Sequence, residues 1–340
     1  MIINGTPDND DLFTISENDE LFGLEGDDDL DASSGLGNNT LDGGMGNDEL
    51  VANTNDSLLG GAGEDDLYAK GILGNNTLKG GDDGDRLFIV EGDDNLLYGN
   101  DGDDKLYVIE GSFNNLQGGG DDDFLKIFSH GGNNLLEGGE GDDTLIGNLA
   151  SDHLFGNDGN DYLYAGKLGT EMTGGAGLDR YYFGNGEIPD EPAVVNDFTQ
   201  GDDQVIIAGI PQVQTFEDII LEQSVNDTLV KALINEVEVT FGILIGITAA
   251  DLTPADFGFL IPVFSITQAS AEEGNGITFT VTRSDDFLTA QSVTVSTSIA
   301  AGDTASVSDF TANSQTLTFA QGETSKTFTV QTIEDSLFEG

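Results

Sequence analysis

Residues 43–50 read Gly-Gly-Met-Gly-Asn-Asp-Glu-Leu, and residues 60–67 read Gly-Gly-Ala-Gly-Glu-Asp-Asp-Leu. Both stretches place an Asp five positions after the first Gly and a Leu two positions after that Asp. The spacing recurs ten times, from Gly5 to Tyr181, with first glycines 17 to 20 residues apart. A fixed period of this length predicts a solenoid in which each repeat forms one coil.

The repeat holds its register throughout. Its aspartates are Asp10, Asp28, Asp48, Asp65, Asp85, Asp104, Asp123, Asp143, Asp161 and Asp179, and its first glycines are Gly5, Gly23, Gly43, Gly60, Gly80, Gly99, Gly118, Gly138, Gly156 and Gly174. Apolar residues alternate on both sides of each Gly/Asp turn, and this period of two predicts short strands with one face inward.

A second, less charged turn completes each coil, as in Gly37-Asn38-Asn39 and Gly74-Asn75-Asn76. Asn and Gly tolerate positive φ, so these segments can reverse the chain without a metal. The sequence leaves open whether this Asn-rich face binds one.

Stacked coils place the aspartates in a column about 4.8 Å apart. At an effective dielectric constant of about 20, neighbouring carboxylates repel by roughly 3 to 4 kcal/mol. A cation between coils would turn this repulsion into attraction. A set of ligands made only of carboxylate and carbonyl oxygens suits calcium. The alternative is that these are ordinary turn residues, since Asp favours turns. Ten copies in one register favour the calcium hypothesis.

Residues 43–50 and 60–67 resemble the haemolysin-type, or repeats-in-toxin (RTX), calcium-binding repeat, G-G-x-G-x-D-x-L-x. The resemblance covers roughly half the chain and implies a parallel β-roll. It also implies several calcium ions between turns, held by the ten aspartates and by carbonyls of the first four positions, Gly43, Gly60, Gly99, Gly138, Gly156 and Gly174 among them. Sites should be weaker where the pattern changes, at Thr6, Asp8, Leu24, Asp83 and Asp121.

The chain holds 64 Asp and Glu against 10 Lys and Arg, a net charge of −54, and residues 1–180 hold 40 against 7, or −33. Self-repulsion should leave the metal-free repeats poorly folded, so we expect folding to be coupled to calcium. Extracellular sites bind calcium near 10⁻⁴ to 10⁻³ M, and such a chain would fold outside the cell. The acidity argues against nucleic acid and anionic membranes as partners. The sequence has neither Cys nor an apolar stretch that could span a membrane.

Three domains are expected: the β-roll over residues 1–181, a β-rich C-terminal cap over 182–261, and a sandwich over 262–340. A cap is expected because a solenoid otherwise exposes the edge of its last coil. Asp197, Asp202 and Asp203 in the cap could alternatively begin a further calcium site.

Residues 262–340 alternate apolar residues with Thr and Ser in four segments, which predicts an antiparallel sandwich. With the acidic segments near residues 273, 309 and 335, this part resembles the Calx-beta domain. The fold class is therefore all-β, with an Ig-like sandwich truncated at Gly340. The resemblance implies calcium ligands at Glu273, Asp309, Glu334, Asp335 and Glu339. The alternative is that these are solvated loop acids.

We expect that the chain is not an enzyme, because His130 and His153 are its only histidines and no nucleophile has a recognisable base nearby. The functional hypothesis is a secreted or cell-surface bacterial calcium-binding scaffold with a structural or adhesive role, and surface proteins or glycans as partners. RTX resemblance implies one-step (type I) export. The alternative is a calcium-dependent secretion and folding module of a larger extracellular hydrolase or toxin.

Overall fold

The computed structural model describes residues 1–128, 131–148, 152–184, 186–260, 263–267, 275–284, 291–298, 309–320 and 323–333. The chain forms two compact units. The first holds residues 1–259 apart from two short segments, and the second is formed mainly by residues 260–340.

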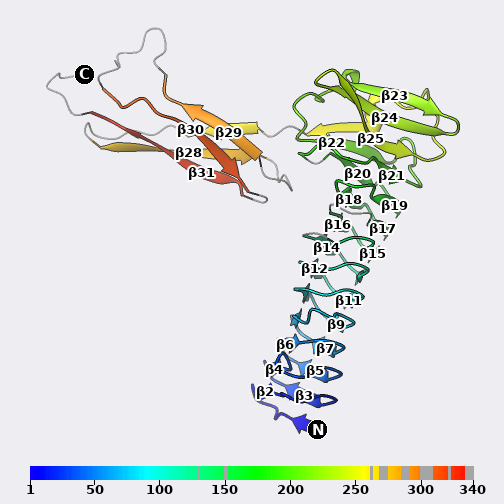
Figure 1. Cartoon of the computed structure of the whole chain (residues 1–340), viewed down its shortest axis with the longest axis vertical. Helices are drawn as coiled ribbons and strands as arrows, with labels where there is room; N and C mark the ends of the chain where they lie inside the picture. The colour runs from blue at the N-terminus through cyan, green and yellow to red at the C-terminus, as the bar shows by residue number, and fades with distance from the viewer. Residues whose placement is uncertain are drawn as a thin grey trace. The chain divides into compact units, whose positions relative to one another are not determined.

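Within residues 2–183 of the first unit, successive strands alternate between two sheets, and neighbouring strands in each sheet are parallel (Figure 1). The first sheet contains β1 (Ile2–Asn4), β3 (Glu20–Glu25), β5 (Thr40–Met45), β7 (Ser57–Ala62), β9 (Thr77–Asp82), β11 (Leu96–Asp101), β13 (Asn115–Gly120), β15 (Leu135–Glu140), β17 (His153–Asp158) and β19 (Glu171–Ala176). The second contains β2 (Asp11–Phe13), β4 (Asp29–Asp31), β6 (Glu49–Ala52), β8 (Asp66–Ala69), β10 (Arg86–Ile89), β12 (Lys105–Val108), β14 (Phe124–Ile127), β16 (Thr144–Ile146), β18 (Tyr162–Tyr164) and β20 (Arg180–Phe183). This is the parallel β-roll that the repeat predicted.

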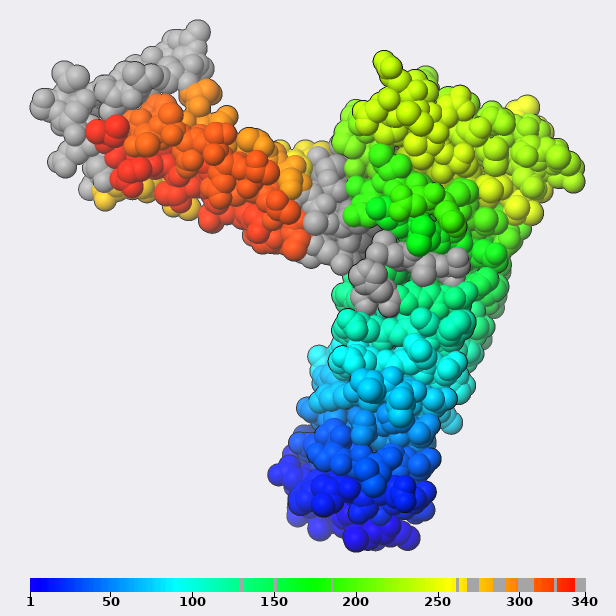
Figure 2. Space-filling model, in the orientation of Figure 1, coloured from blue at the N-terminus to red at the C-terminus, as the bar shows by residue number. Residues whose placement is uncertain are grey.

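The register of the sheets follows the sequence repeat. Leu41 lies beside Leu58 in the first sheet, and Leu50 lies beside Leu67 in the second. These leucines, and their equivalents in the other coils from Leu21 to Leu163, are completely buried between the sheets. Burying a Leu side chain contributes about 1.5 to 3 kcal/mol, so two leucines per coil give the narrow roll a continuous core. The space-filling view shows the coils packed without a break from blue to green (Figure 2).

The strands after β20 extend both sheets of the roll. In the first sheet, β21 (Ala193–Val195) pairs with β19 and is followed by β25 (Val237–Leu244), β24 (Asp227–Ile234) and β23 (Ile219–Ser224), the last two antiparallel. In the second sheet, β22 (Gln204–Ala208) pairs with β20, and β26 (Phe257–Leu260) lies next. Two 3₁₀ turns, η1 (Phe216–Asp218) and η2 (Pro254–Asp256), lie in the connections. These strands cover the edges that an open solenoid would expose.

The second unit contains antiparallel sheets, as the alternating pattern predicted. One sheet contains β27 (Val263–Ile266), β28 (Gly276–Ser284) and β31 (Ser325–Gln331), and the other pairs β29 (Gln291–Ser296) with β30 (Ser314–Phe319). Val281, Leu317, Phe319, Phe328 and Val330 form its buried core. The all-β fold class is confirmed. None of the described segments is a helix with the length and apolar character that crossing a membrane requires.

Candidate metal centre

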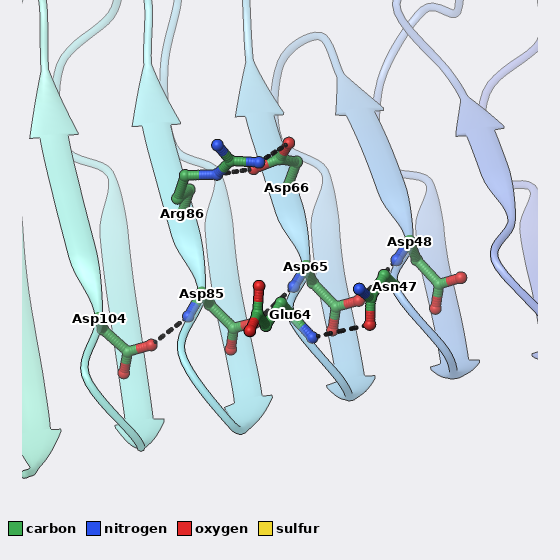
Figure 3. Close-up of polar contacts among 8 residues, drawn as sticks. All are labelled: Asn47, Asp48, Glu64, Asp65, Asp66, Asp85, Arg86 and Asp104. Atoms are coloured by element: carbon green, nitrogen blue, oxygen red, sulfur yellow. Dashed lines mark hydrogen bonds and ion pairs between the residues drawn. The ribbon is translucent and has the colours of Figure 1, made fainter.

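The Gly/Asp turns point their aspartates into the roll. From Asp28 to Asp179 these side chains are 0 to 3% exposed. The backbone N–H of each Asp donates to the Oδ1 atom of the Asp in the next coil, as Asp65 does to Asp85 at 2.8 Å and Asp85 to Asp104 at 2.7 Å (Figure 3). The same bond links all ten predicted aspartates. We call this row of turns the Asp edge.

The first Gly of each repeat makes room for this carboxylate. A Cβ added at Gly43 would stand 2.2 Å from Oδ2 of Asp48 and 2.8 Å from the carbonyl oxygen of Gly60 in the next coil. Gly60, Gly99, Gly138, Gly156 and Gly174 show the same arrangement with their own aspartates. At least two oxygens therefore lie beside the first Gly of each of these repeats. One belongs to the carboxylate, and the other is a carbonyl oxygen of the next coil or, at Gly174, the Tyr181 hydroxyl.

One oxygen of most of these carboxylates has no partner. Oδ2 is buried without a hydrogen bond in Asp28, Asp48, Asp65, Asp85, Asp104, Asp123, Asp143 and Asp161. Leaving a buried acceptor unsatisfied costs about 1 to 3 kcal/mol, and more when it is charged. Within the described residues no three Asp, Glu or His side chains converge on one point. A cation here would therefore take one or two carboxylate oxygens and complete its shell with backbone carbonyls, which fits calcium.

Burial also changes the acidity of the column. It raises the pKa of Asp123 to about 9 and that of Asp85 to about 8, although the backbone N–H bond on each carboxylate opposes the shift. The pKa values of Asp65, Asp104, Asp143 and Asp161 rise to about 7 for the same reason. Ionised carboxylates are thus costly inside the turns, and a bound cation would offset that cost.

The two ends of the Asp edge differ from its middle. Oδ2 of Asp10 accepts hydrogen bonds from the backbone N–H and the hydroxyl of Thr6. At the other end, Tyr181 replaces the repeat Leu, and its hydroxyl lies beside Gly174, whose N–H donates to it at 2.9 Å. The Tyr181 hydroxyl in turn donates to Asp197 at 3.0 Å. At the first end, Thr6 therefore satisfies the carboxylate, and at the other end the Tyr181 hydroxyl lies beside the first Gly of the repeat.

Sequence reasoning did not place Asp197 and Asp203 in this column. Asp203 extends it, because the N–H of Asp179 donates to its Oδ1 at 3.0 Å and the N–H of Thr199 donates to its Oδ2 at 2.7 Å. Asp197 accepts from the N–H groups of Gly174 and Gly175. Val205 follows Asp203 by two positions, as Leu follows each repeat Asp, but the step of 24 residues from Asp179 hides this signal.

The second turns form a different row, which we call the Asn edge. Its inward residues are Asp19, Asn39, Asp56, Asn76, Asn95, Asn114, Asn134 and Asp152, all at most 3% exposed. Each N–H from Asp19 to Asn134 donates to Oδ1 of the next member at 2.8 to 3.0 Å. The sequence predicted turns here but not this ladder.

The predicted site of the second unit is described only at Asp309. Its carbonyl oxygen accepts the N–H of Ile333 at 2.8 Å, and the residue helps line a cleft of about 430 Å³ with Phe279, Phe310 and Phe328. Glu273, Glu334, Asp335 and Glu339 lie outside the described residues.

Of the two histidines, the structure describes His153. Nδ1 of His153 on β17 lies 3.3 Å from Oε2 of Glu171 on β19, and both side chains are substantially exposed. His130 lies outside the described residues.

Comparison with known families identifies both parts of the chain. The RTX calcium-binding nonapeptide repeat matches residues 4–36, 32–54, 53–71, 89–108 and 128–163. Much of the roll matches the RTX repeat. The Calx-beta domain matches residues 260–340. Both resemblances stated from the sequence are confirmed, and they support calcium binding in a β-roll scaffold. RTX repeats are typical of secreted or extracellular proteins, and both families are generally structural.

Two solved structures resemble part of the chain. They are solution structures of the AlgE6R3 and AlgE6R2 subunits from the Azotobacter vinelandii mannuronan C5-epimerase. The first is 21% identical and covers 40% of this chain and 77% of its own, with a TM-score of 0.30. The second is 20% identical and covers 49% and 93%, with a TM-score of 0.28. A comparison with curated proteins gives no match.

Proposed function

We propose that this chain is a calcium-dependent scaffold that works outside the cell or on its surface, as a rigid spacer or adhesive element. One observation carries the proposal. Eight successive coils each hold a buried carboxylate oxygen that no protein group satisfies. The spacing of these oxygens is that of the coils, so cations between coils would satisfy the whole column.

The energies favour coupling of calcium binding to folding. Eight unsatisfied acceptors at about 1 to 3 kcal/mol each are comparable to the 5 to 15 kcal/mol by which whole domains are stable. Without metal, the Asp edge therefore lowers the stability of the folded roll relative to the unfolded chain. The net charge of −54 adds self-repulsion.

The proposed ligands are the Asp carboxylates from Asp28 to Asp161 and carbonyls of the glycines before them. Calcium accepts six to eight oxygens in flexible geometry, whereas magnesium requires a near-ideal octahedron and gives up its waters reluctantly. Carbonyl-rich turns that vary between coils therefore suit calcium better than magnesium. The ion would supply positive charge between coils, and the chain would hold the coils at the spacing that the ion bridges.

The domain limits are part of the proposal. We place the roll at residues 1–181, its cap at 182–261 and the Calx-beta sandwich at 262–340. The cap assignment is supported by β21 and β22, which pair with the last roll strands, β19 and β20. A calcium site in the sandwich, with Asp309 as one ligand, stays a proposal from family resemblance.

The test is a calcium titration of chelator-treated protein followed by far-ultraviolet circular dichroism, with magnesium as the ion control. The double variant Asp104→Asn, Asp143→Asn changes two buried carboxylates of the Asp edge. Its matched control, Asp103→Asn, Asp142→Asn, removes the same charge one residue earlier, where the side chains are exposed and Asn occurs naturally in other repeats.

We expect a cooperative, calcium-specific rise in β-signal near millimolar calcium in the wild type and the control variant. The response should be weaker in the variant Asp104→Asn, Asp143→Asn. Full β-signal in chelator with no response to calcium would contradict the proposal. Equal responses of the two double variants would contradict the assignment of the ligands.

A further inference from the structure

The two edges of the roll satisfy their buried oxygens differently. On the Asn edge, side chains supply the donors that are missing from the Asp edge. Asn95 Nδ2 donates to Asn114 Oδ1 at 2.8 Å and to the Gly92 carbonyl at 3.1 Å. Asn76, Asn114 and Asn134 also donate through Nδ2 to the next member of the ladder. The amides therefore link neighbouring coils twice, through N–H and through Nδ2.

The aspartates within the Asn edge are satisfied as well. Oδ2 of Asp56 accepts the N–H of Asn53 at 2.8 Å, and Oδ2 of Asp152 accepts the N–H of Asn148 at 3.1 Å. Oδ2 of Asp19 accepts the hydroxyl of Thr14. Among the Asn-edge members named above, the unpartnered buried atom is Nδ2 of Asn39, which is a donor and cannot bind a cation.

Strand length explains the difference. The backbone N–H groups that reach Oδ2 of Asp56 and Asp152 belong to Asn53 and Asn148, three and four residues earlier. Both donors lie after the end of the preceding strand, β6 or β16. On the Asp edge the residue four before each middle Asp still lies within a strand, as Gly44 does in β5 before Asp48. The exceptions, Asp10 and Asp203, have Thr6 and Thr199 outside any strand at that place, and these donate.

We infer that calcium enters between coils on the Asp edge alone, while the Asn ladder fixes the register of the coils on the opposite edge without metal. This inference rests on the proposed function for its calcium half and on the hydrogen bonds for its metal-free half. The roll then has one metal-dependent edge and one metal-independent edge. Removing calcium should destabilise the Asp edge, whereas the hydrogen bonds of the Asn edge should still favour the same register of the coils.

The first experiment counts bound calcium by equilibrium dialysis and elemental analysis at saturating calcium. Asp85→Asn with Asp104→Asn should lose at least one ion relative to the wild type. Asn95→Ala with Asn114→Ala should lose none, provided that its circular dichroism spectrum in calcium matches the wild type. Loss of as many ions from the Asn pair as from the Asp pair would overturn the inference.

A single substitution keeps the test independent of gross misfolding. Asn95→Asp is isosteric, removes the Nδ2 donor and supplies a carboxylate. We expect no additional bound calcium and a lower thermal midpoint in calcium. An additional ion with a raised midpoint would show that the Asn edge accepts calcium when given charge. It would overturn the account in which backbone N–H groups satisfy a carboxylate on this edge, as they do for Asp56 and Asp152.

The second experiment measures hydrogen exchange by mass spectrometry in chelator and in calcium. In chelator the roll is only partly folded. Within that residual structure, peptides over residues 109–116 on the Asn edge should exchange more slowly than peptides over 99–105 on the Asp edge, and calcium should protect mainly the latter. Equal exchange of both edges in chelator would overturn the metal-free role of the ladder. A wild type that binds no calcium would refute the proposed function, while the chelator comparison would still decide the role of the Asn ladder.

Discussion

The Oδ2 atom of Asp104 lies 2.0 Å from the point at which any Cβ on residue 99 would stand. Gly99 and Asp104 are thus one structural unit, because the carboxylate fills the volume that the missing side chain leaves. The carbonyl oxygen of Gly118 lies 2.6 Å from the same point. This contact explains why the first Gly and the Asp five residues later recur together in every repeat.

The substitution Gly99→Ala should destabilise the roll by about 1 to 3 kcal/mol through overpacking. The matched control is Gly120→Ala, because a Cβ at Gly120 meets only the Asn100 carbonyl oxygen at 3.9 Å. The measurement is urea unfolding of both variants in excess calcium. Similar losses in the two variants would show that the Gly99 contact with Asp104 is not the cause.

The core prediction concerns Leu106, which is completely buried between the sheets. Leu106→Ala should lower the free energy of unfolding by about 2 to 5 kcal/mol, because it leaves a cavity that neighbouring coils cannot fill. Leu96→Ala serves as control, since Leu96 is 38% exposed. A loss at Leu106 no larger than at Leu96 would argue against a continuous core.

The junction between roll and cap depends on the hydroxyl of Tyr181. Tyr181→Phe removes its bonds to Gly174 and Asp197, and we expect a loss of about 1 to 3 kcal/mol because buried polar groups lose their partner. Tyr68→Phe is the control, since it keeps the ring stacked on Phe88 at 5.0 Å. Thermal unfolding in calcium compares the two, and an unchanged midpoint for Tyr181→Phe would rule out this contribution.

The pH prediction concerns Lys126, which is 7% exposed with Nζ 4.3 Å from the centre of the Phe128 ring. Burial lowers its pKa to about 8. Between pH 8 and 10.5 the unfolded chain binds more protons at this residue than the folded chain does, so its contribution to the free energy of unfolding rises with pH. Lys126→Met should abolish that rise and stabilise the fold at pH 7 by about 2 kcal/mol.

Urea unfolding at pH values from 7 to 10 in excess calcium measures this slope. Lys105→Met on the neighbouring strand β12 is the control, because Lys105 is exposed and its removal should leave the slope unchanged. The same pH slope in wild type and Lys126→Met would contradict the assignment.

Much of the fold could be predicted because its determinants are local. The alternation around Leu41 and Leu50 specifies which face of each strand is buried, and the period of 17 to 20 residues specifies one coil. The Gly and Asp positions specify a turn and an oxygen-rich chemistry. These features act within 20 residues and repeat, so a single sequence reveals them.

Tertiary structure alone decided which oxygens are satisfied. Asp48 and Asp56 look alike as turn residues, yet Oδ2 of Asp48 is buried without a partner while Oδ2 of Asp56 accepts an N–H, because one turn follows a longer strand than the other. Asp203 joins the column through a bond to a residue 24 positions away. The sequence determined that the coils form and what chemistry they carry, whereas stacking determined where that chemistry stays unsatisfied, since hydrogen-bond partners lie in the neighbouring coil.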